Sequence, residues 1–163
     1  MALAAYLTLK GQKQGAINGS VTAKGREGSI LVHSFSHSIL SPRDPASGLP
    51  TGKRQHQAMV ILKEIDKSSP LLWNALVNNE NLPTFQLAFF APVAATGVER
   101  QIYTITLTNA NIASITESML DNELAANASL PLREQIAFTY QKIQWTWTDG
   151  GITAMDDWAM PTT

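Results

Sequence analysis

Hydrophobic and polar residues alternate along most of the chain, beginning close to its first residue. At residues 3–10 every odd position holds leucine or alanine, whereas the even positions hold alanine, tyrosine, threonine and lysine. A period of two sends successive side chains to opposite faces of a strand, so this pattern predicts a strand. The same alternation predicts strands at residues 30–40, 84–90, 102–108 and, more weakly, 111–119.

The predicted strand at residues 30–40 has two unlike faces. Leu31, Phe35 and Ile39 lie on one of them. The opposite face carries small hydroxyl side chains, namely those of Ser34, Ser36 and Ser38. This is the pattern of a strand whose first face is buried and whose second face is polar.

Residues 58–65 are apolar at nearly every position, which is typical of a strand covered on both faces. The segment that follows has the only helical spacing that we identify in the chain. Ser69 suits the N-cap, Pro70 suits the first helical position, and Asn78 and Asn79 end the apolar run. We therefore predict one short α-helix of about ten residues.

The pattern changes phase within the last long predicted strand. Ile136, Phe138 and Tyr140 lie at even positions, whereas Ile143, Trp145 and Trp147 lie at odd ones. A β-bulge near Gln141 and Lys142 is the simplest explanation, because one extra residue exchanges the two faces. Asp149, Gly150 and Gly151 then predict a turn into a short C-terminal tail at residues 149–163.

Residues 41–52 interrupt the strands with three prolines and two glycines. Neither a helix nor a sheet accommodates this composition, so the segment is a loop. Loops of about twelve residues are uncommon in compact domains unless they bind something. Two interpretations stay open, a disordered surface loop and a stiff arm that projects to make a contact.

Six or more predicted strands and one helix indicate a mainly β domain with antiparallel sheets, because parallel sheets need repeated crossover helices. The 163 residues fit a single domain. An open sheet leaves unpaired edges, and identical copies that join these edges around a ring would remove them. A surface with only 15% charged residues suits burial against other copies, although a polar monomer surface explains it too.

The charge is distributed unevenly, although the net charge is only −1. Residues 1–60 carry seven basic and two acidic residues, whereas residues 61–163 carry five basic and eleven acidic ones. If the two halves face opposite ends of the fold, identical copies would attract one another head to tail; an asymmetry without function is the alternative. The near-neutral balance argues against nucleic-acid binding.

Export and membrane insertion can also be judged from the sequence. The chain has no cysteine, so it can pass between reducing and oxidising compartments unchanged. Its N-terminus lacks the basic and apolar regions of a secretory signal peptide, and its longest apolar stretch is too short to span a bilayer. We expect no membrane insertion, and any export requires a dedicated machine.

The search for catalytic, cofactor and metal chemistry finds no site. His33 and His37 have a spacing seen in helical zinc sites, but on a strand the two rings lie about 13 Å apart, so we interpret them as structural. Ser68 and Ser69 fit helix caps better than nucleophiles. Asp156 and Asp157 are adjacent on an extended tail and point to opposite sides. We therefore predict that the protein is not an enzyme and needs no cofactor.

Three sequence blocks resemble one known family, the haemolysin-coregulated proteins (Hcp) of type VI secretion. The most specific block lies within residues 36–72: Ser41-Pro42-Arg43-Asp44, Ser47-Gly48, Thr51-Gly52-Lys53-Arg54-Gln55-His56 and Lys63-Glu64-Ile65-Asp66-Lys67-Ser68-Ser69-Pro70. The other two are the closing strand from Tyr140 to Trp147 and the Asp156-Asp157-Trp158 tail. The resemblance covers nearly the whole chain.

The resemblance implies a single tube domain over residues 1–163, an antiparallel β-barrel with one flanking helix. It implies hexameric rings that stack into the inner tube of a contractile apparatus, with a spike protein at the tip and a surrounding sheath. Effector proteins travel inside the ring, and the protein passes from the bacterial cytoplasm to the medium or a target cell. The fold is similar to that of contractile phage tail-tube proteins, which are the alternative, and an unrelated monomeric β-domain with a small ligand is a third possibility.

Two surfaces follow as site predictions. The first is a contact loop between copies or rings, with Arg43 and Asp44 as complementary charges: Ser41, Pro42, Arg43, Asp44, Pro45, Lys53 and Arg54. The second is a lumen or cargo surface made of Ser34, Ser36 and Ser38, where small polar side chains make weak contacts.

Overall fold

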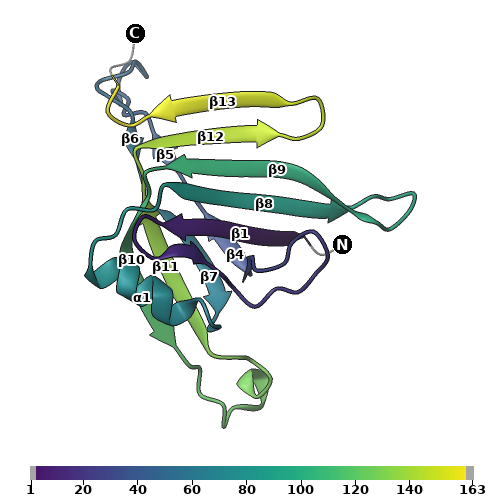
Figure 1. Ribbon diagram of the computed structural model, residues 1–163. Helices are drawn as coiled ribbons and strands as arrows, with labels where there is room; N and C mark the ends of the chain where they lie inside the picture. The colour runs from purple at the N-terminus through teal and green to yellow at the C-terminus, as the bar shows by residue number, and fades with distance from the viewer. Residues whose placement is uncertain (1–2, 161–163) are drawn as a thin grey trace.

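The computed structural model describes residues 3–160 and contains two packed antiparallel sheets with one flanking α-helix (Figure 1). The larger sheet has the strand order β13-β12-β9-β8-β1-β2, and β3 also pairs with β1. Its strands are β1 (Ala4–Gly11), β2 (Gly15–Ile17), β3 (Ile30–Val32), β8 (Thr84–Pro92), β9 (Glu99–Thr108), β12 (Lys142–Trp147) and β13 (Ile152–Asp157).

The smaller sheet has four strands in the order β10-β11-β7-β4. They are β4 (Ser34–Ser36), β7 (Met59–Glu64), β10 (Asn111–Ser118) and β11 (Arg133–Thr139). A separate two-stranded hairpin pairs β5 (Ile39–Leu40) with β6 (Gln55–His56). The sequence-based prediction of a mainly β, antiparallel fold with one flanking helix is confirmed, and the two sheets enclose one core.

The core forms because alternate side chains of neighbouring strands lie in register. Leu7 pairs with Leu87, and Leu87 pairs with Ile105, so three fully buried side chains form one row across the larger sheet. Phe85 of this sheet meets Phe138 of the smaller sheet edge to face, with ring centroids 4.9 Å apart. These aromatic and branched side chains fill the space between the layers and contribute most of the hydrophobic stabilisation.

The chain passes from the larger sheet to the smaller one at His33. The single strand predicted at residues 30–40 is therefore wrong: β3, β4 and β5 belong to three different sheets. Ile30 and Val32 face the core, whereas Leu31, which we predicted to share a face with Phe35 and Ile39, is 40% exposed. The change of sheet rotates the chain, and alternation cannot reveal such a rotation.

The chain returns to the larger sheet between Thr139 and Lys142. The predicted bulge near Gln141 is wrong, because β11 and β12 are separate strands in different sheets. Phe138 and Ile143 are both fully buried, so the phase change keeps the hydrophobic side of each strand on the common core. Figure 1 shows the two strands in the two layers, with β11 running upward from the loop at the bottom and β12 running across.

The helix α1 (Ser69–Val77) packs beside β10, to which Trp73 donates a hydrogen bond of 2.7 Å at Glu117 Oε1. Its N-cap is Ser68, so the predicted cap at Ser69 is wrong by one residue, and Pro70, predicted at the first helical position, is the second residue of the helix. Ser69 Oγ instead accepts a hydrogen bond from the Asp66 backbone at 3.0 Å. Within residues 3–160, no helix has the length and apolar character that crossing a bilayer requires.

The C-terminal tail that we predicted from residue 149 onward contains regular structure, because strand β13 extends to Asp157. The connection between β10 and β11 contains a 3₁₀ turn, η1 (Ala125–Asn127). Strand β13 lies at the edge of its sheet, and its first four residues are exposed on both faces. Exposure on both faces removes the alternation by which a strand is found in a sequence.

Candidate assembly surface

The outer face of the four-stranded sheet is uncharged in its middle, and its charges lie in the end row of Glu64, Arg133 and Ser118. Two rows of paired residues cross it: Ser36, Val60, Ala137 and Ser114 in the first, and Ser34, Leu62, Gln135 and Thr116 in the second. The serines, Gln135 and Thr116 are exposed, whereas the aliphatic side chains are half-buried. The structure therefore places Ser34 and Ser36 on one broad face, while Ser38 lies beyond the end of β4.

Both sides of this sheet end in open edges. Strands β4 and β10 each pair with one neighbour in the sheet, so one side of each carries backbone groups without a strand partner. Unpaired edges favour association with another chain. The two edges lie on opposite sides of the sheet. One copy can therefore pair its β10 edge with the β4 edge of another copy, which is a heterologous contact.

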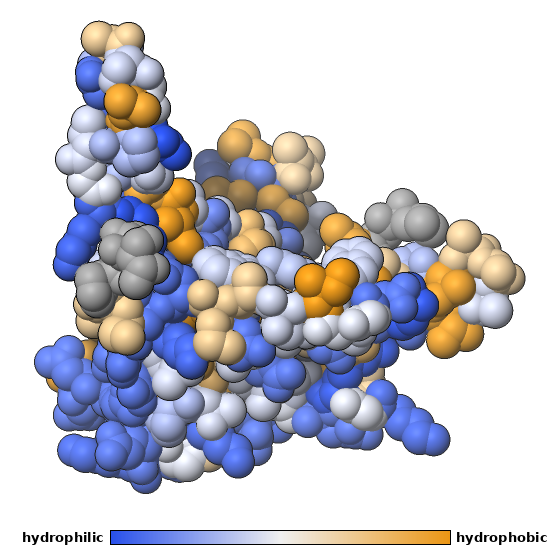
Figure 2. All heavy atoms as spheres, turned by 90° about the horizontal axis from the view of Figure 1, so that it is seen from above, coloured by the Kyte–Doolittle hydropathy of each residue, from blue (hydrophilic) through white to orange (hydrophobic). Residues whose placement is uncertain are grey.

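Residues 41–52 form an ordered arm at one end of the molecule. Backbone hydrogen bonds cross it from Asp44 N to Leu49 O, 2.8 Å, and from Thr51 N to Pro42 O, 3.0 Å. Most of its side chains are exposed, including those of Ser41, Arg43 and Pro45. Seen from above, it extends well beyond the body on the side where β5 and β6 lie (Figure 2).

The two adjacent charges of the arm have different environments. Asp44 accepts hydrogen bonds from Ala46 N at 2.9 Å and Ser47 Oγ at 2.8 Å. The Ala46 amide, followed by the Ser47 hydroxyl, lowers the pKa of Asp44. Arg43 and Lys53 are exposed, and their charged groups contact no hydrogen-bond or ion-pair partner among residues 3–160. Asp44 thus orders the turn, and Arg43 remains available.

Arg54 joins the base of the arm to the C-terminal segment. Its Nε donates to the Asp156 carboxylate, and one terminal nitrogen donates to Asp157 O at 2.7 Å and to Met160 O at 3.0 Å. Burial raises the pKa of Asp156, but the hydrogen bonds from Arg54 and His56 lower it by more. The pKa of Asp156 is therefore below its ordinary value. Arg54 is thus engaged within its own chain.

A histidine–tyrosine cluster lies behind this ion pair. The Tyr140 hydroxyl is 2.7 Å from His56 Nδ1 and 2.7 Å from His37 Nε2, and His56 Nε2 is 2.7 Å from Asp156. Trp158 stacks on His56 with ring centroids 5.1 Å apart. Burial raises the pKa of Tyr140, so its hydroxyl stays protonated. This hydroxyl is hydrogen-bonded to both histidines. These contacts hold the C-terminal segment against the body of the domain.

A second polar cluster is sealed beneath the start of α1. Lys63 donates to Glu134, to Ser69 Oγ at 3.1 Å and to Asp66 at 3.2 Å. Both Lys63 and Glu134 are fully buried. Sequence reasoning missed this cluster, although Lys63 shares the inward parity of Met59 and Ile61. The inward position of Lys63 could have predicted a buried ion pair, because a buried lysine needs an anion beside it.

The remaining sequence candidates are widely separated. His33 lies 3.2 Å from Glu64, whereas His37 contacts Tyr140, so the two histidines belong to different surroundings. Asp156 binds Arg54 and His56, whereas the Asp157 carboxylate accepts a hydrogen bond from Ala159 N at 2.9 Å. Within residues 3–160, no three histidine, cysteine, aspartate or glutamate side chains gather as metal ligands.

Comparison with known proteins identifies relatives over nearly the whole chain. The family model described as "Type VI secretion system effector, Hcp" matches residues 6–147. The "Major exported protein" of Pseudomonas aeruginosa is 38% identical over 170 residues, which cover 99% of this chain and 98% of the relative.

Solved structures agree with these sequence matches. A crystal structure of an Hcp protein has a TM-score of 0.89 at 28% identity, covering 98% of this chain and 100% of the other. Hcp1 from E. coli EAEC 042 has a TM-score of 0.84 at 32% identity, covering 96% and 99%. The secreted protein Hcp3 of Pseudomonas aeruginosa has a TM-score of 0.78 at 30% identity, covering 98% and 100%.

Proposed function

This chain belongs to the Hcp family of type VI secretion proteins, and on that premise we propose that it is a structural subunit of the secretion tube. Identical copies close into hexameric rings, and the rings stack into a tube that a contracting sheath expels behind a spike protein. The protein acts by geometry and catalyses no reaction. The observation that carries this proposal is a four-stranded sheet with two open edges and two uncharged rows of residues across the middle of its outer face.

Ring closure uses the two open edges. The β10 edge of one copy lies against the β4 edge of the next, so that the four-stranded sheets continue around the ring. Each contact joins two different edges, so it is heterologous. Such contacts form a closed ring when a whole number of the rotations between neighbouring copies makes 360°. It also buries the backbone groups that the isolated chain leaves without strand partners.

The outer face of the four-stranded sheet then lines the lumen. Ser34 and Ser36 contribute hydroxyl groups, and Val60 and Leu62 contribute half-buried aliphatic surface between them. Such a surface offers neither a strong charge nor a large apolar patch, so effector proteins bind weakly and separate from it readily. Ser38, at the approach to the hairpin of β5 and β6, marks the mouth of this passage.

We propose that the protein starts in the bacterial cytoplasm and reaches the medium or a target cell inside the tube. The Pseudomonas relative carries the name "Major exported protein", which supports release from the cell. The absence of cysteine fits this route, because a change of redox compartment leaves the chain unaltered.

Light scattering during size-exclusion chromatography tests the proposal directly. We expect a single species with the mass of a hexamer, and annular particles in negative-stain micrographs. A protein that remains monomeric at high concentration, without annular particles, contradicts the proposed function.

The lumen assignment has its own test in Ser36→Glu. This change places a ring of carboxylates in the passage, so we expect intact rings and lower retention of a co-purified effector. Ser129→Glu on the exposed loop before β11 is the matched control and should retain effector as the wild type does. Loss of rings in Ser36→Glu would place this residue at a boundary between copies and reject the assignment.

A further inference from the structure

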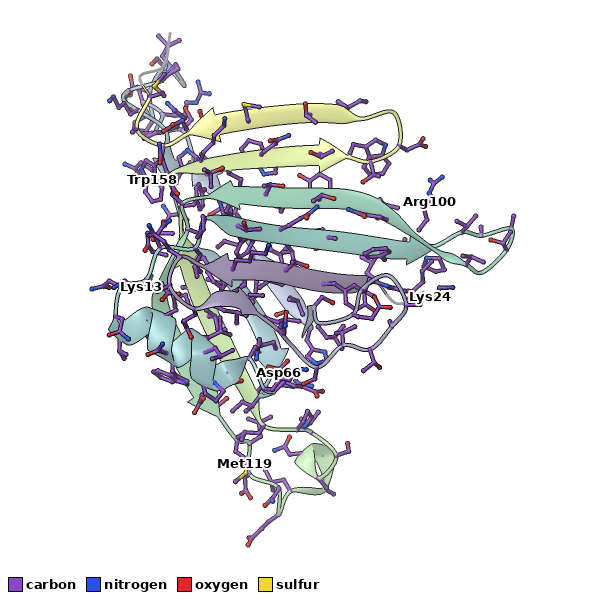
Figure 3. All side chains as sticks on the ribbon, in the orientation of Figure 1. Lys13, Lys24, Asp66, Arg100, Met119 and Trp158 are labelled. Atoms are coloured by element: carbon purple, nitrogen blue, oxygen red, sulfur yellow. The ribbon has the colours of Figure 1, made fainter. Side chains whose placement is uncertain are left out.

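A pocket of about 340 Å³ lies where β1 and β3 meet the end of β7. Its lining includes Tyr6, Leu31, His33, Glu64 and Asp66, together with the loop segment at residues 20–23. That segment precedes Lys24, which lies at the opposite end of the larger sheet from Trp158 (Figure 3). The arm at residues 41–52 is tied to the Trp158 end through Arg54. The arm therefore lies at the Trp158 end of the larger sheet, whereas the pocket includes Asp66, which lies below the middle of that sheet (Figure 3).

The pocket combines two carboxylates with apolar and aromatic walls. The Glu64 side chain is 47% exposed and lies 3.2 Å from His33. Asp66 receives its hydrogen bonds from Lys63 and Ser68 on one oxygen, Oδ1. Burial raises the pKa of Asp66, but the Ser68 hydroxyl and the charge of Lys63 lower it by more, so this carboxylate is ionised. Carboxylates beside an aromatic ring are the groups that a guanidinium prefers.

The same chain already shows this mode of recognition. The Arg26 guanidinium carbon lies 4.6 Å from the centroids of both Tyr6 and Phe90, and its NH1 is 2.7 Å from Glu99. Tyr6 lines both this site and the empty pocket. Arg26 thus illustrates within one molecule how an arginine occupies a site with an aromatic wall and a carboxylate.

Elimination among the five arginines indicates which one fits the pocket. Arg26 is bound to Glu99, Arg54 to Asp156, and Arg100 lies 3.8 Å from Asp149. Arg133 is half-buried, with its Nε shielded from solvent. Arg43 is exposed at the tip region of the arm, and its guanidinium contacts no carboxylate among residues 3–160.

We propose that Arg43 of one copy inserts into the Glu64–Asp66 pocket of the copy in the next ring. This inference rests on the proposed function and deepens it, since it names the contact that joins stacked rings. The contact is heterologous, so it can repeat from one ring to the next and build an open-ended stack. It also gives the separation between a basic N-terminal part and an acidic remainder a structural role.

The arm is prepared for this contact. Two backbone hydrogen bonds and the Asp44 turn hold it in one conformation before docking. An ordered arm loses little conformational freedom on binding, which lowers the cost of association. Each contact is small, so the stack depends on many equivalent contacts per ring and weakens as salt screens the charges.

Charge exchange tests the contact with the full chain. Arg43→Glu and Glu64→Lys are compared singly and together, with light scattering to count copies per ring and sedimentation to measure stacked rings. We expect intact rings in every variant, roughly tenfold less pelleted protein in each single variant, and recovery in the double variant. Glu123→Lys reverses an exposed acidic residue on the loop before β11 and should pellet as the wild type does.

The outcomes separate the two proposals. Monomers of the wild type contradict the ring function, whereas rings whose single variants pellet normally, or whose double variant fails to recover, overturn the pocket contact. A covalent trap provides a second measurement, because the chain has no cysteine of its own. Arg43→Cys and Leu31→Cys, prepared separately and mixed under oxidising conditions, should form a disulfide-linked dimer. Homodimers alone would also overturn the contact.

Discussion

The two polar clusters of this protein use hydrogen-bonded side chains for different purposes. The Lys63–Glu134 cluster is an ion pair sealed inside the fold beneath α1. In the Tyr140 cluster both His37 and His56 contact the Tyr140 hydroxyl, and His56 also contacts the half-buried Asp156. The first fixes the helix against the four-stranded sheet, and the second fixes the C-terminal segment and the base of the arm.

The comparison teaches that burial determines how far the loss of one partner spreads. A fully buried ion that loses its partner stays in a medium of low polarity, so the cost falls on the whole fold. In the Tyr140 cluster, His37 and Asp156 are half-buried, so water can reach them when a partner is lost and the cost remains more local. The first cluster should therefore control stability, and the second should control the end of the molecule that carries the arm.

Lys63→Met should have the largest effect on stability. It leaves Glu134 buried without a cation, which costs about 3–5 kcal/mol of unfolding free energy. Chemical denaturation at one fixed protein concentration measures the difference. Lys67→Met, at an exposed neighbouring position, is the matched control and should change stability by less than about 0.5 kcal/mol.

The double variant Lys63→Met/Glu134→Leu sharpens this result. Removing both charges should recover most of the loss, because apolar side chains of similar size replace buried ion pairs well. Glu134 Oε2 has no hydrogen-bond partner in the fold, so the leucine displaces no further contact at that atom. A double variant as unstable as the single one would show that packing, and not charge, controls this site.

Tyr140→Phe should have an intermediate effect of about 1–3 kcal/mol. It removes the hydroxyl that contacts both His37 and His56 but keeps the ring. Protease cleavage near the C-terminus should rise more than global unfolding does, because the lost hydroxyl lies in the cluster that holds this segment. Tyr103→Phe is the control, since no described residue hydrogen-bonds its hydroxyl. Equal cleavage in both variants would contradict the local role of Tyr140.

A change of pH should have the smallest effect, and it should come mainly from His37. Burial, followed by the charge of His56, lowers the pKa of His37 below its ordinary value of 6.5. Below pH 6.5, His37 binds a proton more readily in the unfolded chain than in the folded chain. The contribution of His37 to the free energy of unfolding is therefore fully present above pH 6.5, and it is lost as the pH falls through the folded pKa. Denaturation curves at several pH values measure this slope. In His37→Gln the slope should flatten, and an unchanged slope would assign it to other groups.

Most of the strands could be predicted because their alternation records a buried face. The inward positions of Leu7, Leu87 and Ile105 follow from the alternation within each strand, and the stop signals around residues 41–52 are visible in the sequence. The pairing that joins these three side chains into one row is not visible there. The sheet changes at His33 and at Tyr140–Gln141 were not predictable either. At His33 and at Tyr140–Gln141 the pattern shifts in a way that a bulge or a single strand explains equally well, because periodicity contains no information about which strand a segment pairs with.

The candidate surfaces were predictable only in part. The serines of β4 could be assigned to one polar face by parity, and two of them do share the outer face of the four-stranded sheet. The partners of Arg54 and Tyr140 lie about 100 positions away or on the other side of a sheet change, so no local pattern records them. That the Arg43 guanidinium has no carboxylate partner among residues 3–160 likewise cannot be read from the sequence, because it depends on the ion pairs of the folded chain.

The short connections of the chain between the two main sheets have a mechanical consequence. Layers that are held only by side-chain packing can slide past one another under a sideways force. Here the backbone passes directly from β3 to β4, from β9 to β10 and from β11 to β12, so sliding would have to stretch covalent connections at three places. The domain therefore resists a sideways force through the polypeptide itself as well as through its packed core.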